Sequence, residues 1–255
     1  MVLIERLGRG IIVGIEDLGR IALLLVDAFG WLVRPPFRIG VMLKQAEFVG
    51  VQSLFVVILT GGFTGAVLAL QSYHAFRLFT AEELVSVAVA LSMTRELGPV
   101  LTSLMVAARA GSAMAAELGT MRITEQIDAL ATMAVSPVNY LVTPRIVAGV
   151  VMVPLLTVIC DVIGMLGGYI VAVGLLDIPS GTYLSRMWEA LYFEDVVDGL
   201  IKSVVFGLLI ALIGCYKGFY TTGGAEGVGR ATTEAVVWAS ISILVSDYFL
   251  TALLF

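Results

Sequence analysis

Charged side chains are scarce in this sequence of 255 residues: Asp, Glu, Lys and Arg together make up 14% of it. Ordinary globular chains carry about 25%. Hydrophobic residues reach 59%, and the mean hydropathy is +1.01. A soluble protein of this size needs a polar outer shell, and the sequence lacks the residues to build one. Long charge-free runs alternate with short charged clusters, so we expect an all-α polytopic membrane protein.

Cysteine and histidine, two residue types that often bind metal ions or take part in catalysis, are also few. The sequence has two cysteines and one histidine. Cys160 and Cys215 lie inside apolar runs, where we expect inert buried thiols. His74 follows an apolar run and is expected at the membrane interface. The sequence has no Cys or His spacing typical of a metal site, and neither HExxH nor GxSxG. We therefore predict no catalytic residue and no metal, and the net charge of −5 argues against a nucleic-acid partner.

The P-loop pattern of nucleotide-binding proteins, GxxxxGK[ST], is missing as well. The nearest string, "GLIKS" at Gly199–Ser203, lacks the glycine before the lysine. No cofactor is expected in this chain. Any work that is driven by ATP and Mg²⁺ must therefore come from a partner subunit.

Five apolar runs are long enough to cross a bilayer, which takes about 20 residues. In the first run, Gly61 and Gly65 have the small-xxx-small spacing that lets another helix approach closely, and Gly164 and Gly168 repeat it in the third. Together with their connectors, the runs predict a transmembrane domain over residues 46–255. The expected spans are residues 48–73, 84–108, 146–176, 200–216 and 235–255.

Residues 1–45 have a different pattern, in which apolar residues recur every three or four positions. A helix with one such apolar face lies in the headgroup plane rather than across the membrane. We therefore expect an N-terminal interfacial amphipathic helix, which the prolines of "RPP" at Arg34–Pro36 end. Its apolar positions include Ile15, Leu18, Leu25 and Phe29.

The distribution of lysine and arginine predicts how the spans are oriented, because these residues gather on the cytoplasmic side. Eleven of them lie before the first span or in the connectors after the second and fourth, whereas only Arg77 and Arg186 lie in the opposite connectors. We expect the N-terminus in the cytoplasm and the C-terminus outside. The eleven are Arg6, Arg9, Arg20, Arg34, Arg38, Lys44, Arg109, Arg122, Arg145, Lys217 and Arg230.

A short charged stretch, "MRITEQIDAL" at Met121–Leu130, lies between the second and third spans, on the expected cytoplasmic side. Its period predicts an amphipathic helix at about residues 119–136, N-capped by Thr124 and ended by Pro137. The pattern fits a surface helix on the headgroups or a coupling helix that a cytoplasmic protein grips. The apolar face holds Ile123, Ile127, Leu130, Ala131 and Ala134, and the polar side holds Arg122, Glu125, Gln126 and Asp128.

Two charged residues, Arg95 and Glu96, fall near the middle of the second span, where each charge costs about 2.5–3.5 kcal/mol to insert. Candidate partners on other spans are Lys202, Asp161 and Asp247. Pairing Glu96 with Lys202 and Arg95 with Asp247 would form a network, but the sequence does not choose the pairing.

These intramembrane charges have three interpretations. They can lock helices together as ion pairs, or Glu96, Asp161 or Asp247 can relay protons in a secondary transporter. Alternatively, Arg95 faces a central cavity and holds a lipid phosphate by bidentate contact. The candidate cavity residues are Arg95, Glu96, Lys202 and Asp247, with Leu70 and Tyr73 from the outer end of the first span.

Two further charged pairs carry simpler predictions. Arg109 and Glu117 stand among small residues at the end of the second span, where we expect a structural junction. Arg230 and Glu234 have i, i+4 spacing and are expected to form a surface pair.

Several stretches over residues 50–255 resemble the MlaE/YrbE family of ABC permeases. The resemblance is carried by "LSMTRELGPVLTSLMVAARAGSAMAAELGTMRITEQIDAL", "SPVNYLVTPR", "VPLLT", "IKSVVFG" and "GVGRATTEAVV". It favours the coupling-helix interpretation of the charged stretch, with Arg122, Glu125, Gln126, Asp128 and Leu130 as coupling residues.

The resemblance implies a homodimeric, non-catalytic permease subunit in the bacterial inner membrane. Two copies would bind two cytoplasmic ABC ATPase subunits, which hold the ATP and Mg²⁺, and a periplasmic ring of MCE-domain proteins. The implied substrate is phospholipid, moved between the inner membrane and a periplasmic carrier route that maintains outer-membrane lipid asymmetry. The alternative is a proton-coupled secondary transporter.

Overall fold

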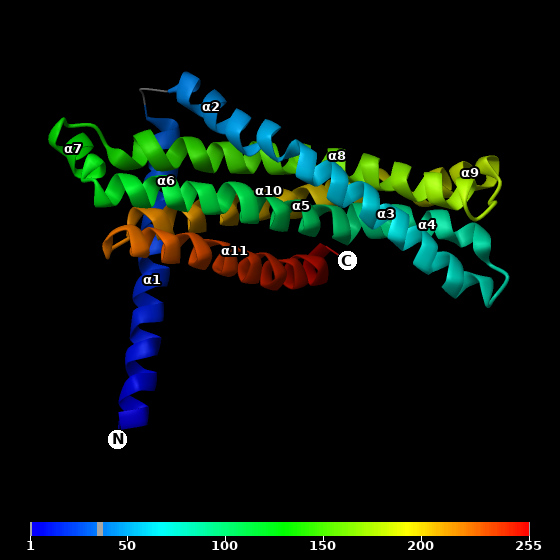
Figure 1. The fold of residues 1–255 in the computed structure, drawn as a ribbon, viewed down its shortest axis with the longest axis horizontal. Helices are drawn as coiled ribbons and strands as arrows, with labels where there is room; N and C mark the ends of the chain where they lie inside the picture. Colours follow the sequence, from blue (N-terminus) through cyan, green and yellow to red (C-terminus); the bar gives the residue numbers. More distant parts are fainter. Residues whose placement is uncertain (1, 35–37, 255) are drawn as a thin grey trace.

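The computed structural model of this chain describes residues 2–34 and 38–254, with side chains from residue 15 onward except residue 33. In this part of the chain every regular element is a helix (Figure 1). Five stretches are long and apolar enough to cross a membrane, so the expected all-α polytopic architecture is confirmed. They are Ile39–Arg77, Glu82–Ile123, Val138–Gly174, Phe193–Phe219 and Gly224–Leu254.

Most of these stretches contain several helical segments in succession. Among the short segments, η1 and η2 are 3₁₀-helices, whereas η3, η4 and η5 are π-helices, whose backbone bonds run from i to i+5. In chain order the elements are α1 (Val2–Val33), α2 (Ile39–Val49), η1 (Val51–Ser53), α3 (Leu54–Arg77), η2 (Glu82–Leu84), α4 (Val85–Ser92), η3 (Met93–Leu97), α5 (Gly98–Val106), η4 (Ala107–Gly111), α6 (Ser112–Ile123), α7 (Gln126–Thr132), η5 (Val138–Val142), α8 (Thr143–Gly174), α9 (Ser180–Ala190), α10 (Phe193–Phe219) and α11 (Gly224–Leu254).

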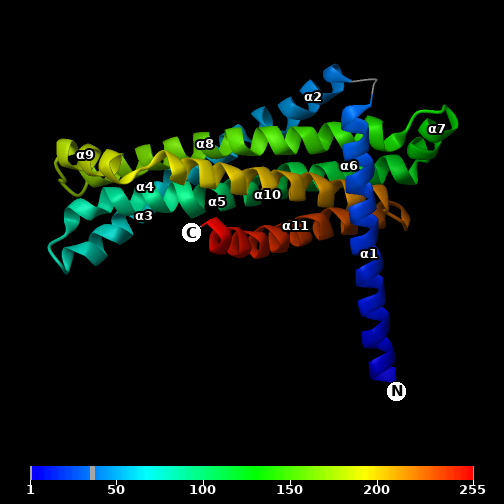
Figure 2. The same cartoon turned by 180° about the vertical axis from the view of Figure 1, so that it is seen from behind.

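The first helix, α1, runs across the bundle, whereas the five spans extend along its length (Figures 1 and 2). Leu18 and Leu23 on α1 are 68% and 71% exposed, while Leu24 and Ala28 are buried against the bundle. A helix that crosses the spans with an exposed apolar face fits the expected position in the headgroup plane. The proline pair at 35–36, expected to end this helix, lies outside the described residues.

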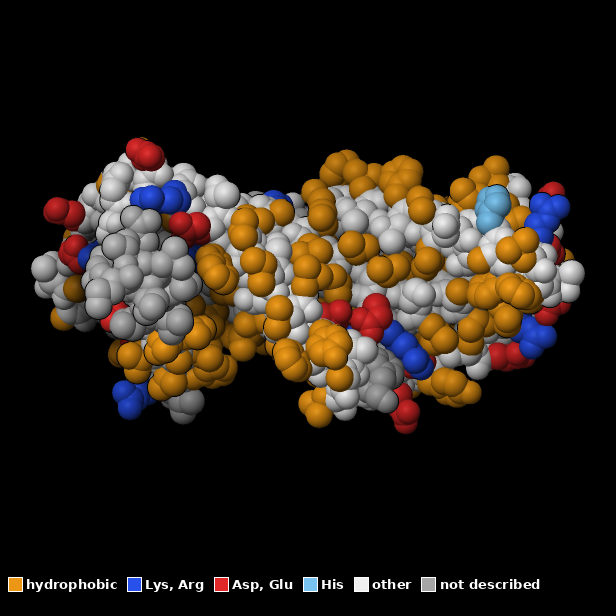
Figure 3. Space-filling model, turned by 90° about the horizontal axis from the view of Figure 1, so that it is seen from below, with side chains coloured by type: hydrophobic (Ala, Val, Ile, Leu, Met, Phe, Trp, Pro, Cys, Tyr) orange, Lys and Arg blue, Asp and Glu red, His pale blue; other side chains and the backbone are white. Residues whose placement is uncertain are grey.

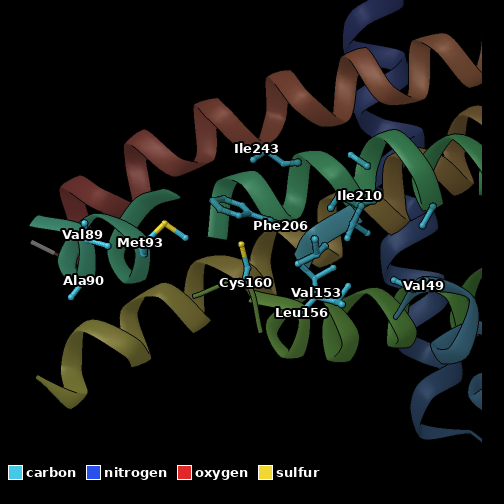
Figure 4. Packing of buried hydrophobic residues seen from close by; sticks show 14 of the residues in the cluster. Val49, Val89, Ala90, Met93, Val153, Leu156, Cys160, Phe206, Ile210 and Ile243 are labelled. Atoms are coloured by element: carbon cyan, nitrogen blue, oxygen red, sulfur yellow. The ribbon is translucent and has the colours of Figure 1, made fainter. Parts of the chain in front are cut away.

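The core of the bundle forms around α8, which packs along both α3 and α10. Figure 4 shows Cys160 and Leu156 of α8 close to Phe206 of α10, with Met93 of η3 nearby. All four side chains are buried. Cys160 and Cys215 are both free and buried, as predicted. Since lipid tails are as apolar as these side chains, close van der Waals packing holds such helices together.

Glycines bring α3 and α8 into backbone contact. A Cβ at Gly65 would overlap the backbone of Gly164, and a Cβ at Gly61 would lie 2.8 Å from the carbonyl oxygen of Cys160. The small-xxx-small spacing therefore marks a close helix crossing, as predicted.

Gly65→Ala is expected to destabilise the folded bundle, because α3 must move away from α8 to admit the methyl group. Overpacking of this kind costs about 1–3 kcal/mol. The measurement is the melting temperature of the detergent-solubilised protein. Gly174→Ala is the matched control, because nothing lies within 4 Å of a Cβ there. A Gly65→Ala protein that melts at the temperature of the control would contradict the close crossing.

The second span continues beyond Ala108, where the sequence predicted its end. The Arg109 guanidinium donates hydrogen bonds to the Phe48 carbonyl at 2.7 Å, to Ser53 Oγ at 2.9 Å and to the Gln52 side chain. Because these acceptors satisfy the guanidinium, the second span continues through Arg109, which lies in η4, and on into α6. Arg109 thus forms a structural junction, as predicted.

The connectors at the opposite end from α7 are joined by an exposed ion pair. Arg186 on α9 lies 3.0 Å from Glu83 on η2. The hydrogen bond and charge of Glu83 raise the pKa of the Arg186 guanidinium. This contact links two segments that are distant in the sequence.

Candidate functional site

Side chains and a backbone carbonyl from several spans surround the ammonium group of one lysine, Lys202. Nζ of Lys202 on α10 lies 2.9 Å from Oε1 of Glu96 on η3 and 3.3 Å from Oδ1 of Asp247 on α11. It also donates hydrogen bonds to the Arg95 carbonyl at 2.9 Å and to Thr251 Oγ1 at 2.8 Å. Of the pairings that the sequence left open, Glu96 with Lys202 is therefore present. We call the following set the ion cluster: Arg95, Glu96, Asp195, Lys202, Asp247 and Thr251.

Burial differs sharply within the ion cluster. The Lys202 side chain is fully buried, whereas those of Glu96 and Asp247 are 38% and 19% exposed. An ammonium group has three N–H donors, and each finds an acceptor here. The Thr251 hydroxyl in turn donates to Glu96 Oε1 at 3.1 Å. A buried cation is thus held by carboxylates that reach the surface. Figure 3 shows acidic and basic side chains together among apolar ones in the middle of one face, with further charged side chains at both ends.

Arg95 forms an ion pair with Asp195, and among the described residues it has no ion pair with Asp247, a pairing that the sequence left open. Arg95 Nε and Nη2 lie 2.7 Å and 2.5 Å from Asp195 Oδ1. Asp195 precedes residue 200, where the sequence predicted the start of the fourth span, but α10 begins at Phe193 and therefore includes it. Its other oxygen accepts a hydrogen bond from the backbone N–H of Tyr192 at 3.0 Å. Asp247 forms an ion pair with Lys202 instead.

The π-helix η3 carries the two consecutive charged residues of the cluster. Its Arg95 side chain reaches the start of α10, while the Arg95 carbonyl and the Glu96 side chain both reach Lys202. A single π-turn within an α-helix is rare and is frequent at functional sites. Sequence periodicity, which assumes 3.6 residues per turn, does not reveal such a turn.

Leu70 and Tyr73, predicted to line the same cavity, have no contact with the ion cluster among the described interactions. Leu70 is 44% exposed on α3. The Tyr73 ring lies 6.1 Å from the ring of His74 and 6.0 Å from the Arg77 guanidinium. His74 is exposed at this end of α3, as its interface prediction requires. A lipid-lining role for Leu70 and Tyr73 stays a prediction.

Asp161 on α8 also lies outside the ion cluster. Its side chain is buried, and its Oδ1 lies so close to Gly98 that a Cβ there would overlap it. Among the described residues, Oδ1 has no hydrogen-bond partner. The ion cluster therefore forms without this candidate.

The predicted helix at residues 119–136 is divided in the structure. α6 continues to Ile123, and α7 covers only the seven residues Gln126–Thr132. Thr124 is not an N-cap: it follows the end of α6, and its hydroxyl donates to the Thr120 carbonyl at 2.8 Å. Glu125 takes a left-handed conformation with φ 60°, which turns the chain between the two helices.

The far end of α7 also differs from the prediction. The helix stops at Thr132, where Ala134 with φ 59° turns the chain, so Pro137 does not end it. Of the predicted apolar face, Ile127 is buried and Ile123 and Leu130 are partly buried. Ala131, inside α7, and Ala134, beyond its end, are both exposed.

The polar side of α7 is exposed and partly fixed. Arg122 at the end of α6 lies 2.7 Å from Asp128 on α7, which holds the two helices at a set angle. Gln126 donates a hydrogen bond to Thr124 at 3.0 Å. Glu125, Gln126 and Asp128 are all exposed. Together with buried Ile127, this arrangement makes α7 a small projection anchored to the end of the bundle (Figure 1).

Two other acidic residues have partners that the sequence did not indicate. Glu117 on α6 pairs with the buried guanidinium of Arg145 on α8 at 2.6 Å. Glu234 pairs with Lys217 on α10 at 2.8 Å, so the predicted Arg230–Glu234 surface pair is wrong. The i, i+4 rule considers contacts within one helix only. Here the packing of α10 against α11 places Lys217, rather than Arg230, within ion-pair distance of Glu234.

Comparison with known proteins identifies the family of this bundle. The family model described as "Permease MlaE" matches residues 42–253. The chain belongs to the MlaE permease family. The matched residues include the whole ion cluster and α7.

Curated relatives agree with this MlaE assignment. A "Probable ABC transporter permease protein" of Rickettsia bellii is 49% identical over 94% of this chain and 93% of the relative. The "Intermembrane phospholipid transport system permease protein MlaE" of Haemophilus influenzae is 40% identical over 99% of this chain and 97% of the relative. The chloroplastic protein TRIGALACTOSYLDIACYLGLYCEROL 1 of Arabidopsis thaliana is 39% identical over 84% of this chain and 61% of the relative. This MlaE-family chain is a multi-pass ABC transporter permease.

Proposed function

We propose that this permease moves phospholipids and that a separate ABC ATPase subunit drives it. The observation that carries the proposal is the ion cluster, which places charge among apolar spans and exposes part of it. A phospholipid combines an anionic phosphate with acyl chains, and therefore matches this combination of charge and apolar surface. The name of the Haemophilus relative, an intermembrane phospholipid transport system permease, supports the same substrate.

Arg95 is the residue best placed to receive a phosphate. Its side chain is 37% exposed, whereas that of its partner Asp195 is 4% exposed. Asp195 therefore orients the guanidinium while a lipid headgroup can still approach it. The planar guanidinium suits bidentate contact with phosphate oxygens. Glu96, Lys202 and Asp247 then set the position of η3 relative to α10 and α11.

α7 is the part of the chain through which an ATPase can act on the spans. α7 follows the second span. The Arg122–Asp128 ion pair joins it to α6, and buried Ile127 anchors it to the bundle. ATP and Mg²⁺ would bind to the partner, and this chain would be a non-catalytic subunit. We place α7 and the N-terminus in the cytoplasm and the C-terminus in the periplasm, on the basis of the lysine and arginine count.

A second copy of this chain fits against α11. Only 11% of the most apolar window of α11 is buried within one chain, compared with 28–50% in the other spans. Because Asp247 and Thr251 are on this helix, such a homodimer would bring two ion clusters near its interface. The exposed apolar side chains of α11 are Val237, Trp238, Ile241, Leu244, Val245, Tyr248, Phe249 and Leu253.

The family relationship supports a proposal for the biological setting. We place the permease in a bacterial inner membrane, with a periplasmic ring of MCE-domain proteins as its further partner. Phospholipid would pass between this membrane and a periplasmic carrier route, which maintains outer-membrane lipid asymmetry.

Reconstitution in vesicles tests the proposed function. With the ATPase subunit and ATP present, transfer of a fluorescent phospholipid is expected, and it should stop when ATP is withheld. The rival function, a proton-coupled secondary transporter, predicts transfer that follows an imposed pH gradient without ATP. Transfer driven by the gradient alone would contradict the proposal.

Arg95→Ala is expected to lower the amount of phospholipid that copurifies with the permease, by about tenfold if a charge-assisted contact to phosphate is lost. Quantitative mass spectrometry of extracted lipid measures it. Arg77→Ala is the matched control, because Arg77 is an exposed arginine on α3 outside the ion cluster. Equal lipid content in both variants would favour a purely structural role for Arg95.

A further inference from the structure

A polar cavity of about 260 Å³ lies where α1 crosses the end of α10 and the start of α11. Asp17 and Arg20 line it from α1, Tyr216 and Lys217 from α10, and Arg230 from α11. A water molecule takes up about 30 Å³ in the liquid, so the cavity can hold a group of several heavy atoms. It shares no lining residue with the ion cluster.

The cavity carries more positive than negative charge. Glu234 pairs with Lys217 at 2.8 Å, Asp17 accepts a hydrogen bond from the Tyr216 hydroxyl at 2.6 Å, and Arg20 lies 3.9 Å from Glu16 on the same helix. Among the described residues, no carboxylate lies within ion-pair distance of Arg230, which is exposed. An anion that enters the cavity would therefore meet a cation that is not already neutralised by a neighbour. The charged lining consists of Arg20, Lys217 and Arg230 against Asp17 and Glu234.

The depth of the cavity in the membrane is set by α1. The apolar face of α1 and its course across the spans place this helix among the headgroups (Figure 2). Aromatic residues, which gather at membrane interfaces, surround the cavity: the Tyr220 ring centre is 6.0 Å from the Arg20 guanidinium, and the Trp238 ring centre is 5.8 Å from Lys217 Nζ. The cavity therefore opens at the level of lipid phosphates.

We propose that this cavity binds the phosphate of an anionic phospholipid from the leaflet at the α7 end of the bundle. Arg230 and Arg20 supply N–H donors to the phosphate oxygens, and Lys217 adds positive charge. The bound lipid ties α1 to the ends of α10 and α11. This site is independent of the transport proposal, because it needs only the interface and the three cations. A soluble phosphate offers the same chemistry, and the experiment separates the two sources.

Native mass spectrometry of the full-length, detergent-solubilised chain measures the binding directly. Dioleoylphosphatidylglycerol is the lipid probe, and dioleoylglycerol, which lacks the phosphate, is the reference. Arg230→Gln is expected to weaken the tightest phosphatidylglycerol binding about tenfold, with dioleoylglycerol unchanged. Arg230→Lys should retain most of the binding because it keeps the charge. Arg77→Gln removes an exposed arginine elsewhere and should bind as the wild type does.

Inorganic phosphate in the millimolar range provides the second arm. If it leaves phosphatidylglycerol bound, the lipid is the ligand. If it displaces one phosphatidylglycerol from the wild type and none from Arg230→Gln, the acyl chains add no affinity beyond that of phosphate, and the assignment to a lipid rather than to phosphate from solution is overturned. Equal phosphatidylglycerol binding by the wild type and Arg230→Gln would overturn the site itself. Because no step requires the ATPase or transport, failure here leaves the proposed function untouched.

Discussion

Lys202→Met is expected to abolish phospholipid transport and to destabilise the permease by about 3–5 kcal/mol. This is the cost of removing one partner of a buried ion pair, because the other partner is left as an uncompensated charge. The Lys202 ammonium is fully buried and bonded to Glu96, Thr251 and the Arg95 carbonyl, with Asp247 at 3.3 Å. Without it, two carboxylates face each other among apolar spans. Transport in reconstituted vesicles and the melting temperature in detergent measure the two effects.

A neutral version of the cluster separates stability from function. In the triple variant Lys202→Met, Glu96→Gln, Asp247→Asn no uncompensated carboxylate is left beside the removed ammonium, so most of the lost stability should return. Transport should remain absent, because the charges that position η3 against α10 and α11 are gone. Transport at the wild-type rate in Lys202→Met would show that the ion cluster is dispensable.

Asp128→Lys and Glu125→Lys are expected to uncouple the permease from its ATPase while leaving the protein inserted and folded. Both carboxylates are exposed on the α7 projection, so reversal changes the surface that a partner contacts without exposing the core. We expect transport-linked ATP hydrolysis to fall at least about tenfold, since a like-charge contact at an interface costs several kcal/mol. Co-reconstituted permease and ATPase provide the measurement. Glu189→Lys, which reverses an exposed carboxylate on α9, is the control.

The Arg122–Asp128 pair allows a second control on α7. Arg122→Asp combined with Asp128→Arg keeps an ion pair between α6 and α7 but reverses the charge shown to the partner. If Asp128 acts on the partner, the swapped protein stays uncoupled. If the swap restores coupling, Asp128 serves to hold α7 at its angle. Normal coupling in both single reversals would remove α7 from the mechanism.

The fold could be predicted well from the sequence because membrane spans leave a strong signal. Each of the five apolar runs became a span, and the small-xxx-small glycines lie at the α3–α8 crossing. The sequence also indicated that Glu96 and Lys202 need partners inside the spans, since few charges occur there, but it did not choose the pairing. Boundaries were less accurate: Arg109 finds acceptors on η1 and α2, so the second span continues past it.

The errors come from backbone geometry and from contacts between distant segments, neither of which periodicity encodes. Asp195 was missed because α10 begins before its apolar run. The helix at residues 119–136 was predicted too long because Glu125 and Ala134 adopt left-handed φ values, which only tertiary context imposes on residues other than glycine. The cavity at Arg20, Lys217 and Arg230 joins three elements that are far apart in the sequence, and no local pattern connects them.

We expect α7 on the cytoplasmic side, where an ATPase can reach it. Ala129 is exposed on α7, and both native cysteines are buried, so Ala129→Cys provides a single reactive thiol. The decisive measurement is labelling of this variant in spheroplasts with a membrane-impermeant maleimide. The account predicts no labelling until the membrane is permeabilised. Labelling of intact spheroplasts would place α7 in the periplasm and contradict it.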